Sequence, residues 1–180
     1  MIRQEEMVEL CKRGDPVAYT FLYNQYSKEV YNTILRVVDH TAEAEDILQE
    51  SFIAAFERID KLQNEGGFKA WVKRIAINKS IDRLRKRKIR FVELEPEWIS
   101  KEDDKIDEKA FEFTLEAVTG AIQTLTQGAR TIFCLFVIEN IPHAEIAHML
   151  GMEHAAVRTQ YHRAKNKILS VLTEGGVYEQ

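Results

Sequence analysis

Residues 142–168, with the sequence PHAEIAHMLGMEHAAVRTQYHRAKNKI, decide the fold of the C-terminal part of the chain. The stretch from Pro142 to Leu150 is amphipathic and stops at Gly151, where a tight turn often requires a residue with positive φ. Beyond the turn, apolar residues recur at helical spacing, namely Val157, Tyr161, Ala164 and Ile168. This pattern predicts two helices packed around a short turn, a helix-turn-helix.

The second helix of this pair carries cations and hydrogen-bonding groups opposite its apolar stripe. The candidate residues for contact with duplex DNA are Arg158, Thr159, His162, Arg163 and Lys165. An apolar back and a cationic front are what a recognition helix in the major groove needs. The alternative for this segment alone is an ordinary helical hairpin with a solvated, charged face.

A second cationic segment lies far from the first. Residues 60–90 carry 11 basic and 3 acidic side chains, a net charge of +8, although the whole chain of 180 residues has −4. A helix is expected from Phe68 to about Lys88, after a loop that contains two glycines. Its candidate DNA-binding residues are Phe68, Trp71, Arg74, Asn78, Lys79 and Arg83.

Cations neutralise phosphates, and aromatic rings can stack on unpaired bases. The mixture in residues 68–88 therefore favours a protein that captures melted DNA. Two alternatives stay open. Phe68 and Trp71 can instead belong to the hydrophobic core, and the basic run 83–90 can be a nonspecific phosphate-binding patch.

The rest of the N-terminal sequence also predicts helices. Gly14-Asp15-Pro16 marks the end of one helix and the start of the next, which continues to Val38. Thr41 is the expected N-cap of a third helix. An apolar stripe at helical spacing follows, made of Leu48, Phe52, Ala55, Ile59 and Leu62.

These patterns predict an all-α fold of two helical domains. The first is expected over residues 1–92 and the second over 108–180, joined by an acidic linker at 93–107. The second domain is expected to hold four helices, with the helix-turn-helix at its end. Their approximate ranges are 108–125, 128–138, 142–150 and 154–172.

Composition and short motifs limit the classes of protein to which this chain can belong. No apolar run is long enough to span a membrane, and the N-terminus lacks an apolar signal core, so we expect a cytoplasmic protein without membrane insertion. Cys11 and Cys134 are lone thiols that we expect in the core. No metal or other cofactor is expected, because the histidines lack the spacing of a zinc site. We interpret four of them as surface or DNA-backbone residues, namely His143, His148, His154 and His162. We find no phosphate-cradling glycine motif, nucleophile elbow or HExxH, and therefore expect no enzyme.

Three segments together resemble one known family. Residues 43–52, EAEDILQESF, are similar to the AEDLVQETF segment of bacterial RNA polymerase sigma factors of the sigma-70 family. Residues 68–85, with the pattern FxxWVxRIAxNxxxDxxR, resemble the family's next signature, and residues 144–164 resemble its C-terminal helix-turn-helix. Three motifs in register are specific, and the short two-domain form is similar to the extracytoplasmic-function (ECF) branch.

The resemblance implies a specificity subunit that binds core RNA polymerase, through its β′ clamp and β flap, and directs transcription initiation without catalysis of its own. Asp46, Gln49 and Glu50 match the surface that binds the clamp. Residues 62–69 and the helix from Trp71 match the part that melts the minus-ten element and reads its non-template strand. Residues 158–165 match the reader of the duplex minus-thirty-five element. An anti-sigma factor is a further implied partner.

Two other hypotheses fit parts of the sequence. A helix-turn-helix transcriptional regulator that acts without polymerase would leave the aromatic basic helix and the Asp46–Glu50 face unexplained. A sigma-like mimic that only titrates a protein partner has no need of Arg74, Asn78 or a cationic recognition helix, and this chain has all three.

Overall fold

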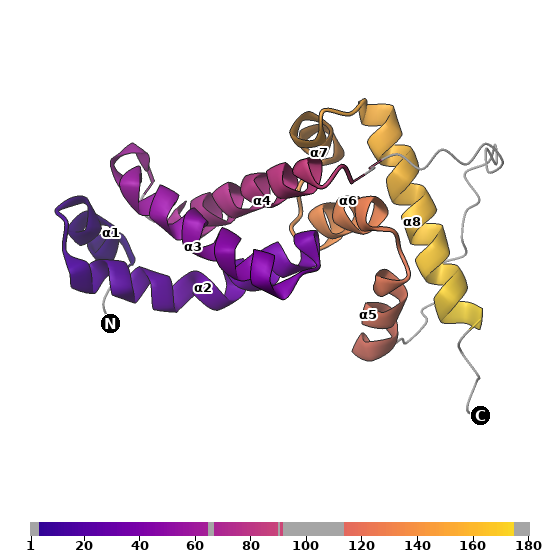
Figure 1. Cartoon of the computed structure of the whole chain (residues 1–180), viewed down its shortest axis with the longest axis horizontal. Coiled ribbons are helices and arrows are strands. Elements are labelled where there is room, and N and C mark those ends of the chain that lie inside the picture. The colour runs from indigo at the N-terminus through magenta and orange to yellow at the C-terminus, as the bar shows by residue number, and fades with distance from the viewer. Residues whose placement is uncertain (1–3, 65–66, 90, 92–113, 175–180) are drawn as a thin grey trace. The chain divides into compact units, whose positions relative to one another are not determined.

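The computed structural model describes residues 4–64, 67–89, 91 and 114–174, and within these ranges every regular element is a helix (Figure 1). The chain divides into two compact units between Ile89 and Arg90. The expected all-α fold class is confirmed. The predicted acidic linker at 93–107 lies outside the described residues.

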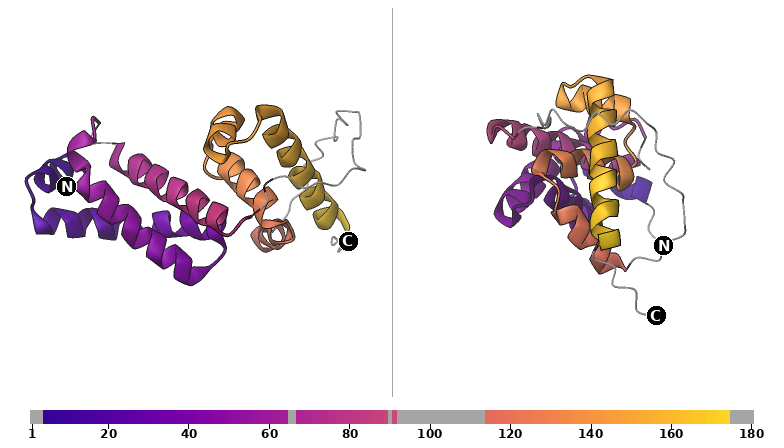
Figure 2. Two further views of the ribbon diagram at one scale, coloured as in Figure 1. Left: turned by 45° about the horizontal axis from the view of Figure 1, so that its top comes forward. Right: turned by 90° about the vertical axis from the view of Figure 1, so that its right-hand side faces the viewer.

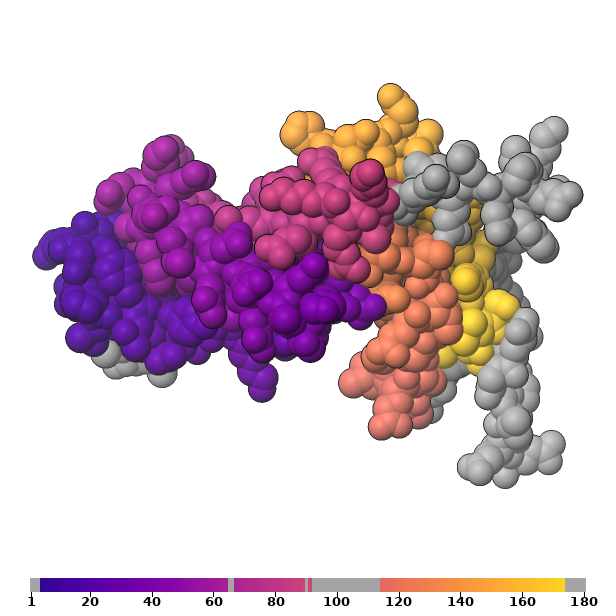
Figure 3. Space-filling model, in the orientation of Figure 1, coloured from indigo at the N-terminus to yellow at the C-terminus, as the bar shows by residue number. Residues whose placement is uncertain are grey.

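The first unit is a bundle of helices. Its elements are α1 (Gln4–Lys12), α2 (Pro16–Val38), α3 (Thr41–Glu57), the short 3-10 helix η1 (Ile59–Lys61) and α4 (Phe68–Lys86). The three longest helices pack against one another, while α1 contacts α2 and η1 (Figure 2). In the space-filling view, α2, α3 and α4 form one continuous surface (Figure 3).

The turn between α1 and α2 has the predicted chemistry. Gly14 has a φ of +81°, a backbone conformation that favours glycine. Asp15 is the N-cap of α2, and its Oδ1 accepts a hydrogen bond from the Val17 N–H at 2.8 Å. Pro16 occupies the first helical position, where its missing N–H is not needed.

The N-cap of α3 is His40, so the prediction of Thr41 is wrong. Asp39 ends α2 in the left-handed conformation, with a φ of 53°. His40 is then extended, and its Nδ1 accepts a hydrogen bond from the Glu43 N–H at 3.3 Å. Because the left-handed residue redirects the chain at position 39, the helix begins one residue earlier than the threonine pattern indicates.

The predicted apolar stripe is confirmed as core, because all five of its residues are buried. The stripe continues beyond the end of the helix in which it begins. Helix α3 ends at Glu57, and η1 then places Ile59 at 3 % exposure and leads to Leu62 at 7 %. The hydrophobic period of the sequence therefore continues through a change from α to 3-10 geometry.

The second unit contains the four expected helices in the expected order, apart from residues 108–113, which lie outside the described residues. They are α5 (Leu115–Gln123), α6 (Gln127–Val137), α7 (His143–Leu150) and α8 (His154–Glu174). The long helix α8 packs against each of the other three. One core cluster joins α5, α6 and α8: Ala121, Leu125, Ala129, Phe133, Ala164, Ile168 and Leu172.

The helix-turn-helix is formed by α7 and α8. Gly151 ends α7 with φ 65° and ψ 37°, and the Met152 N–H donates to the Ala147 carbonyl at 2.9 Å. This is the hydrogen-bonded glycine turn that commonly closes a helix. Val157 is fully buried, so the apolar side of α8 faces the unit's interior and its opposite side faces solvent.

Cys11 and Cys134 are buried as expected, at 1 % and 2 % exposure, and neither forms a disulfide. Burial, with a smaller effect of Asp15, raises the pKa of the Cys11 thiol to about 11. Among the described residues, no group of three potential metal ligands comes together. The helices in the described ranges are too short or too polar to cross a bilayer.

Candidate nucleic-acid and polymerase interfaces

The cations of α4 are not all presented freely to solvent, because acidic residues of α2 and α3 lie beside them. Glu29 of α2 contacts two of these cations, with its carboxylate oxygens 2.9 Å from Lys69 Nζ and 3.5 Å from Lys73 Nζ. The hydrogen bond from Lys69 is the main reason why the pKa of Glu29 lies below its ordinary value. The carboxylate therefore stays ionised and holds the two lysines at the start of α4.

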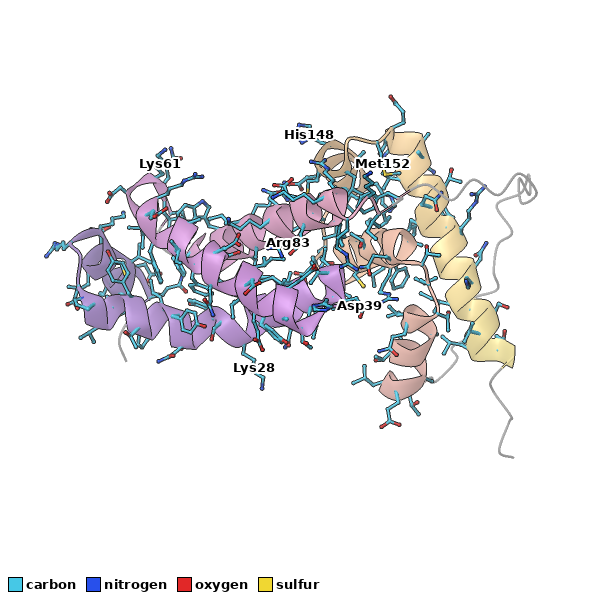
Figure 4. The ribbon with its side chains drawn as sticks, in the orientation of Figure 1. Lys28, Asp39, Lys61, Arg83, His148 and Met152 are labelled. Atoms are coloured by element: carbon cyan, nitrogen blue, oxygen red, sulfur yellow. The ribbon has the colours of Figure 1, made fainter. Side chains whose placement is uncertain are left out.

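Glu50 of α3 forms the second of these contacts. Its Oε2 lies 3.2 Å from Lys79 Nζ, and its Oε1 lies 3.6 Å from an Nη atom of Arg83, the α4 residue labelled in Figure 4. All three side chains are partly exposed. A single carboxylate thus bridges two of the predicted minus-ten residues.

A third acidic contact lies at the end of α4. Arg87 donates hydrogen bonds to Glu43 and to the Val38 carbonyl, each at 3.1 Å. The three acidic side chains Glu29, Glu43 and Glu50 thus hold five basic ones. We call this set of ion pairs the α4 ion-pair row.

The other predicted minus-ten residues lie along one line of α4. Trp71, Arg74 and Asn78 follow each other at i, i+3 and i+7, a spacing that places them on the same helix face. Trp71 and Arg74 are half-buried and Asn78 is exposed. The helix therefore brings an aromatic ring, a guanidinium and an amide to one partly accessible face.

Phe68 does not belong to this accessible face, which corrects its prediction as a DNA-binding residue. Its side chain is 0 % exposed. It lies within an aromatic cluster, with ring centroids 5.9 Å from Phe56 and 6.3 Å from Trp71. A ring enclosed in this way has no surface left for a base, so the core interpretation holds for Phe68.

The predicted polymerase-binding residues form one exposed face of α3. Asp46, Gln49 and Glu50 are all exposed, while Ile47 and Leu48 between them are buried. Ile53, seven residues after Asp46, extends the same face and is 58 % exposed. An exposed isoleucine bordered by acidic and amide groups is suited to serve as an apolar anchor with polar surroundings in a protein interface.

Ile53 is missing from the predicted site, yet the sequence holds a signal for it. Its position falls outside the stripe that carries Leu48, Phe52 and Ala55, so a helical pattern places this large apolar residue on the solvent side. Lys69 and Lys73 are also missing from the prediction. Their signal is positive charge in the first turns of a helix, where it is unfavourable without a nearby acid.

The recognition helix α8 presents its predicted residues outward. Arg158, Thr159, His162 and Lys165 are exposed, and Arg163 is half-buried. Thr159 Oγ1 donates to the Ala155 carbonyl at 2.9 Å, which orients the hydroxyl along the helix. Gln160 faces inward and is only 3 % exposed.

His143 departs from the expectation of a surface or DNA-backbone histidine. Its ring stacks on Phe136 with centroids 3.9 Å apart and lies 4.9 Å from Tyr161, so it links α7 to α6 and α8. Burial, followed by the nearby His154, His162 and Arg158, lowers its pKa from 6.5. The neutral ring therefore serves as a packing element at the base of the recognition helix.

Comparison with known proteins shows to which family these two units belong. The model of sigma-70 region 2 matches residues 22–89, and that of sigma-70 region 4 matches residues 115–168. Each match lies within one compact unit. The two regions, in this order, define the class of bacterial RNA polymerase sigma factors.

Relatives that align over nearly the whole chain identify the branch of this class. The chain is 29 % identical to the ECF RNA polymerase sigma factor SigW of Bacillus subtilis, over 94 % of this chain and 97 % of that one. It is 27 % identical to the RNA polymerase sigma-H factor of Pseudomonas aeruginosa, over 92 % of each chain. The chain belongs to the extracytoplasmic-function branch of the sigma-70 family.

Solved structures share the fold. CnrH, solved in complex with the cytosolic domain of CnrY, aligns over 96 % of this chain and 99 % of its own, with a TM-score of 0.54 and 20 % identity. The sigma factor RpoE from Bartonella quintana, solved with the anti-sigma factor NepR, aligns over 86 % of this chain and 96 % of its own, with a TM-score of 0.54 and 17 % identity.

Proposed function

We propose that this sigma factor binds core RNA polymerase in the cytoplasm, recognises a two-part promoter and opens it, with no catalysis of its own. The observation that carries the proposal is the separation of two cationic helices, α4 and α8, into two compact units that each match a different sigma-70 region. One helix carries aromatic and amide groups for unpaired bases. The other is the second helix of a helix-turn-helix, which suits duplex DNA.

The α3 face made of Asp46, Gln49, Glu50 and Ile53 is the proposed surface for the β′ clamp. Its exposed acids suit a cationic partner, and the exposed Ile53 supplies an apolar anchor. The β flap is the proposed polymerase contact of the second unit.

The proposed minus-ten surface is the line of Trp71, Arg74 and Asn78 on α4, together with Lys79 and Arg83. Strand opening costs base stacking, which aromatic stacking and captured bases can offset. The non-template strand is the proposed ligand because its exposed bases and phosphates match aromatic and cationic groups on one helix. The buried ring of Phe68 packs against Trp71 and thereby supports this surface from the core.

The proposed minus-thirty-five surface is the outer side of α8. Replacing Arg158 and Arg163 with alanine is expected to weaken binding of holoenzyme to promoter duplex and to lower the slope of log K against log salt by about 0.9 for each phosphate that the variant no longer neutralises. A salt titration of binding measures this slope. The matched control removes two exposed cations of the first unit, Arg13→Ala with Lys28→Ala, and is expected to keep the slope. An unchanged slope in the α8 variant would remove both arginines from the interface.

Transcription in vitro tests the proposed function as a whole. The full chain is added to core polymerase with a library of promoter fragments, and the transcripts are sequenced. A sigma factor is expected to give transcripts that start downstream of a shared two-part motif. A regulator would give none unless another sigma factor were added, and a mimic would suppress transcription directed by another sigma factor. Either of these two results would contradict the proposal.

An anti-sigma factor is the further proposed partner. The structures of CnrH and of Bartonella RpoE were both solved as complexes, the latter with a protein named as an anti-sigma factor. The exposed polymerase-binding face on α3 gives such a partner a surface whose occupation would exclude polymerase.

A further inference from the structure

Glu50 belongs to two surfaces at once. It is part of the proposed clamp-binding face of α3, and its carboxylate also bridges Lys79 and Arg83 of the proposed minus-ten surface. We propose that Glu50 is a positioning residue that holds these two cations in the free chain. When a cation of the polymerase pairs with the Glu50 carboxylate, Lys79 and Arg83 become available to bind DNA. This inference rests on the proposed function and adds to it a coupling between its two binding events.

The geometry of the bridge supports an exchange of partners. Lys79 and Arg83 lie four residues apart on α4, so their side chains are neighbours on one helix face. Each uses a different oxygen of the same carboxylate, at 3.2 and 3.6 Å. When Glu50 turns to a cation of another protein, the two α4 side chains lose their counter-charge together. A DNA phosphate then supplies the same kind of acceptor to both.

Accessibility also favours this exchange. The Glu50 side chain is 51 % exposed, and those of Lys79 and Arg83 are 33 % and 28 % exposed. A partner can therefore reach the carboxylate without unfolding the helix pair. Glu29 lies on α2, outside the proposed clamp face, so its ion pairs with Lys69 and Lys73 are expected to persist in the holoenzyme.

The size of the effect is set by the strength of the ion pairs. Partly exposed pairs are individually weak, so freeing two cations is expected to change DNA affinity by about threefold to tenfold. Coupling between two ligands is reciprocal, so DNA must strengthen polymerase binding by the same factor. The device therefore favours the complex in which polymerase and melted DNA are both bound.

The experiment measures binding of the full chain, without polymerase, to a fluorescein-labelled single-stranded oligonucleotide of mixed sequence at low salt. The test variant is Glu50→Gln. The matched control is Glu45→Gln, which removes the same charge from an exposed residue of the same helix. Among the described residues, Glu45 takes part in no ion pair. Both substitutions are repeated in a Lys79→Met, Arg83→Met background, and circular dichroism verifies that each variant folds.

The proposal expects Glu50→Gln to tighten DNA binding by about threefold to tenfold and to steepen its salt dependence, since more cations are available. Glu45→Gln should change affinity by less than about twofold. In the Lys79→Met, Arg83→Met background, the gain from Glu50→Gln should disappear. At saturating core polymerase, the gain in DNA affinity that core confers should be smaller for Glu50→Gln than for the unaltered chain.

Two results would overturn the coupling while leaving the proposed function intact. One is an equal gain from Glu50→Gln and Glu45→Gln, which would reflect net charge alone. The other is a gain that survives without Lys79 and Arg83. If no variant bound the oligonucleotide and core polymerase conferred no DNA binding either, the proposed minus-ten surface would fail together with the coupling.

Discussion

A chain that carries Asp46→Ala, Gln49→Ala and Glu50→Ala is expected to fold normally and to lose its binding to core RNA polymerase. All three side chains are exposed, so their removal leaves the core of the first unit intact. Truncating one partner of a charge pair that is buried and hydrogen-bonded in an interface costs about 2–5 kcal/mol, and this variant removes two charges at once. Affinity should therefore fall by at least about a hundredfold, as measured by co-elution with core polymerase or by surface plasmon resonance.

The control for this experiment removes two exposed charges elsewhere in the same unit. Glu5→Ala with Glu6→Ala, in the first turn of α1, gives the same change in net charge and is expected to keep polymerase binding. Circular dichroism should give the same helix content for both variants. Normal assembly of the triple variant would show that the clamp contacts another part of the chain.

Substitution Phe68→Ala is expected to destabilise the first unit by about 3–5 kcal/mol, the usual cost of truncating a buried phenylalanine. The ring is fully buried and contacts the rings of Tyr26, Phe52, Phe56 and Trp71, so its removal leaves a cavity at the start of α4. Hydrogen exchange of the α3 and α4 amides measures the loss within this unit alone. The readout matters because a chain of two units need not unfold in one step.

Ile53→Ala provides the comparison for Phe68→Ala. Ile53 is a large apolar residue of the same unit but is 58 % exposed, so its truncation should change stability by only about 0.5 kcal/mol. A Phe68→Ala chain that kept its amide protection but lost promoter opening would return Phe68 to the DNA-binding surface. Loss of protection, by contrast, fits an aromatic core.

Helices were predictable because their signal is local. The stripe from Leu48 to Leu62, the glycine turns at Gly14 and Gly151 and the amphipathic pattern of α8 each lie within one short window of sequence. Burial follows directly from such periodicity when the helix has one apolar side. The exposed positions of Arg158 and His162 on α8 follow from the same pattern.

Other features required the tertiary structure. An aromatic residue beside a basic helix could lie in the core or at a DNA surface, and only packing placed Phe68 among four rings. His143 likewise joins a stack whose other members come from α6 and α8. The pairing of Glu29 with Lys73, 44 residues later, or of Glu50 with Lys79, 29 residues later, has no local pattern at all.

The α4 ion-pair row affects how strongly this protein is expected to bind chromosomal DNA outside promoters. A promoter competes with some millions of other sites, and any protein with unshielded cations accumulates on them. Residues 60–90 alone carry a charge of +8, yet residues 1–59 carry −5, and three acids of that segment lie directly against α4. The first unit is therefore expected to bind random duplex weakly, which would keep more of the population available in solution for its cognate sites.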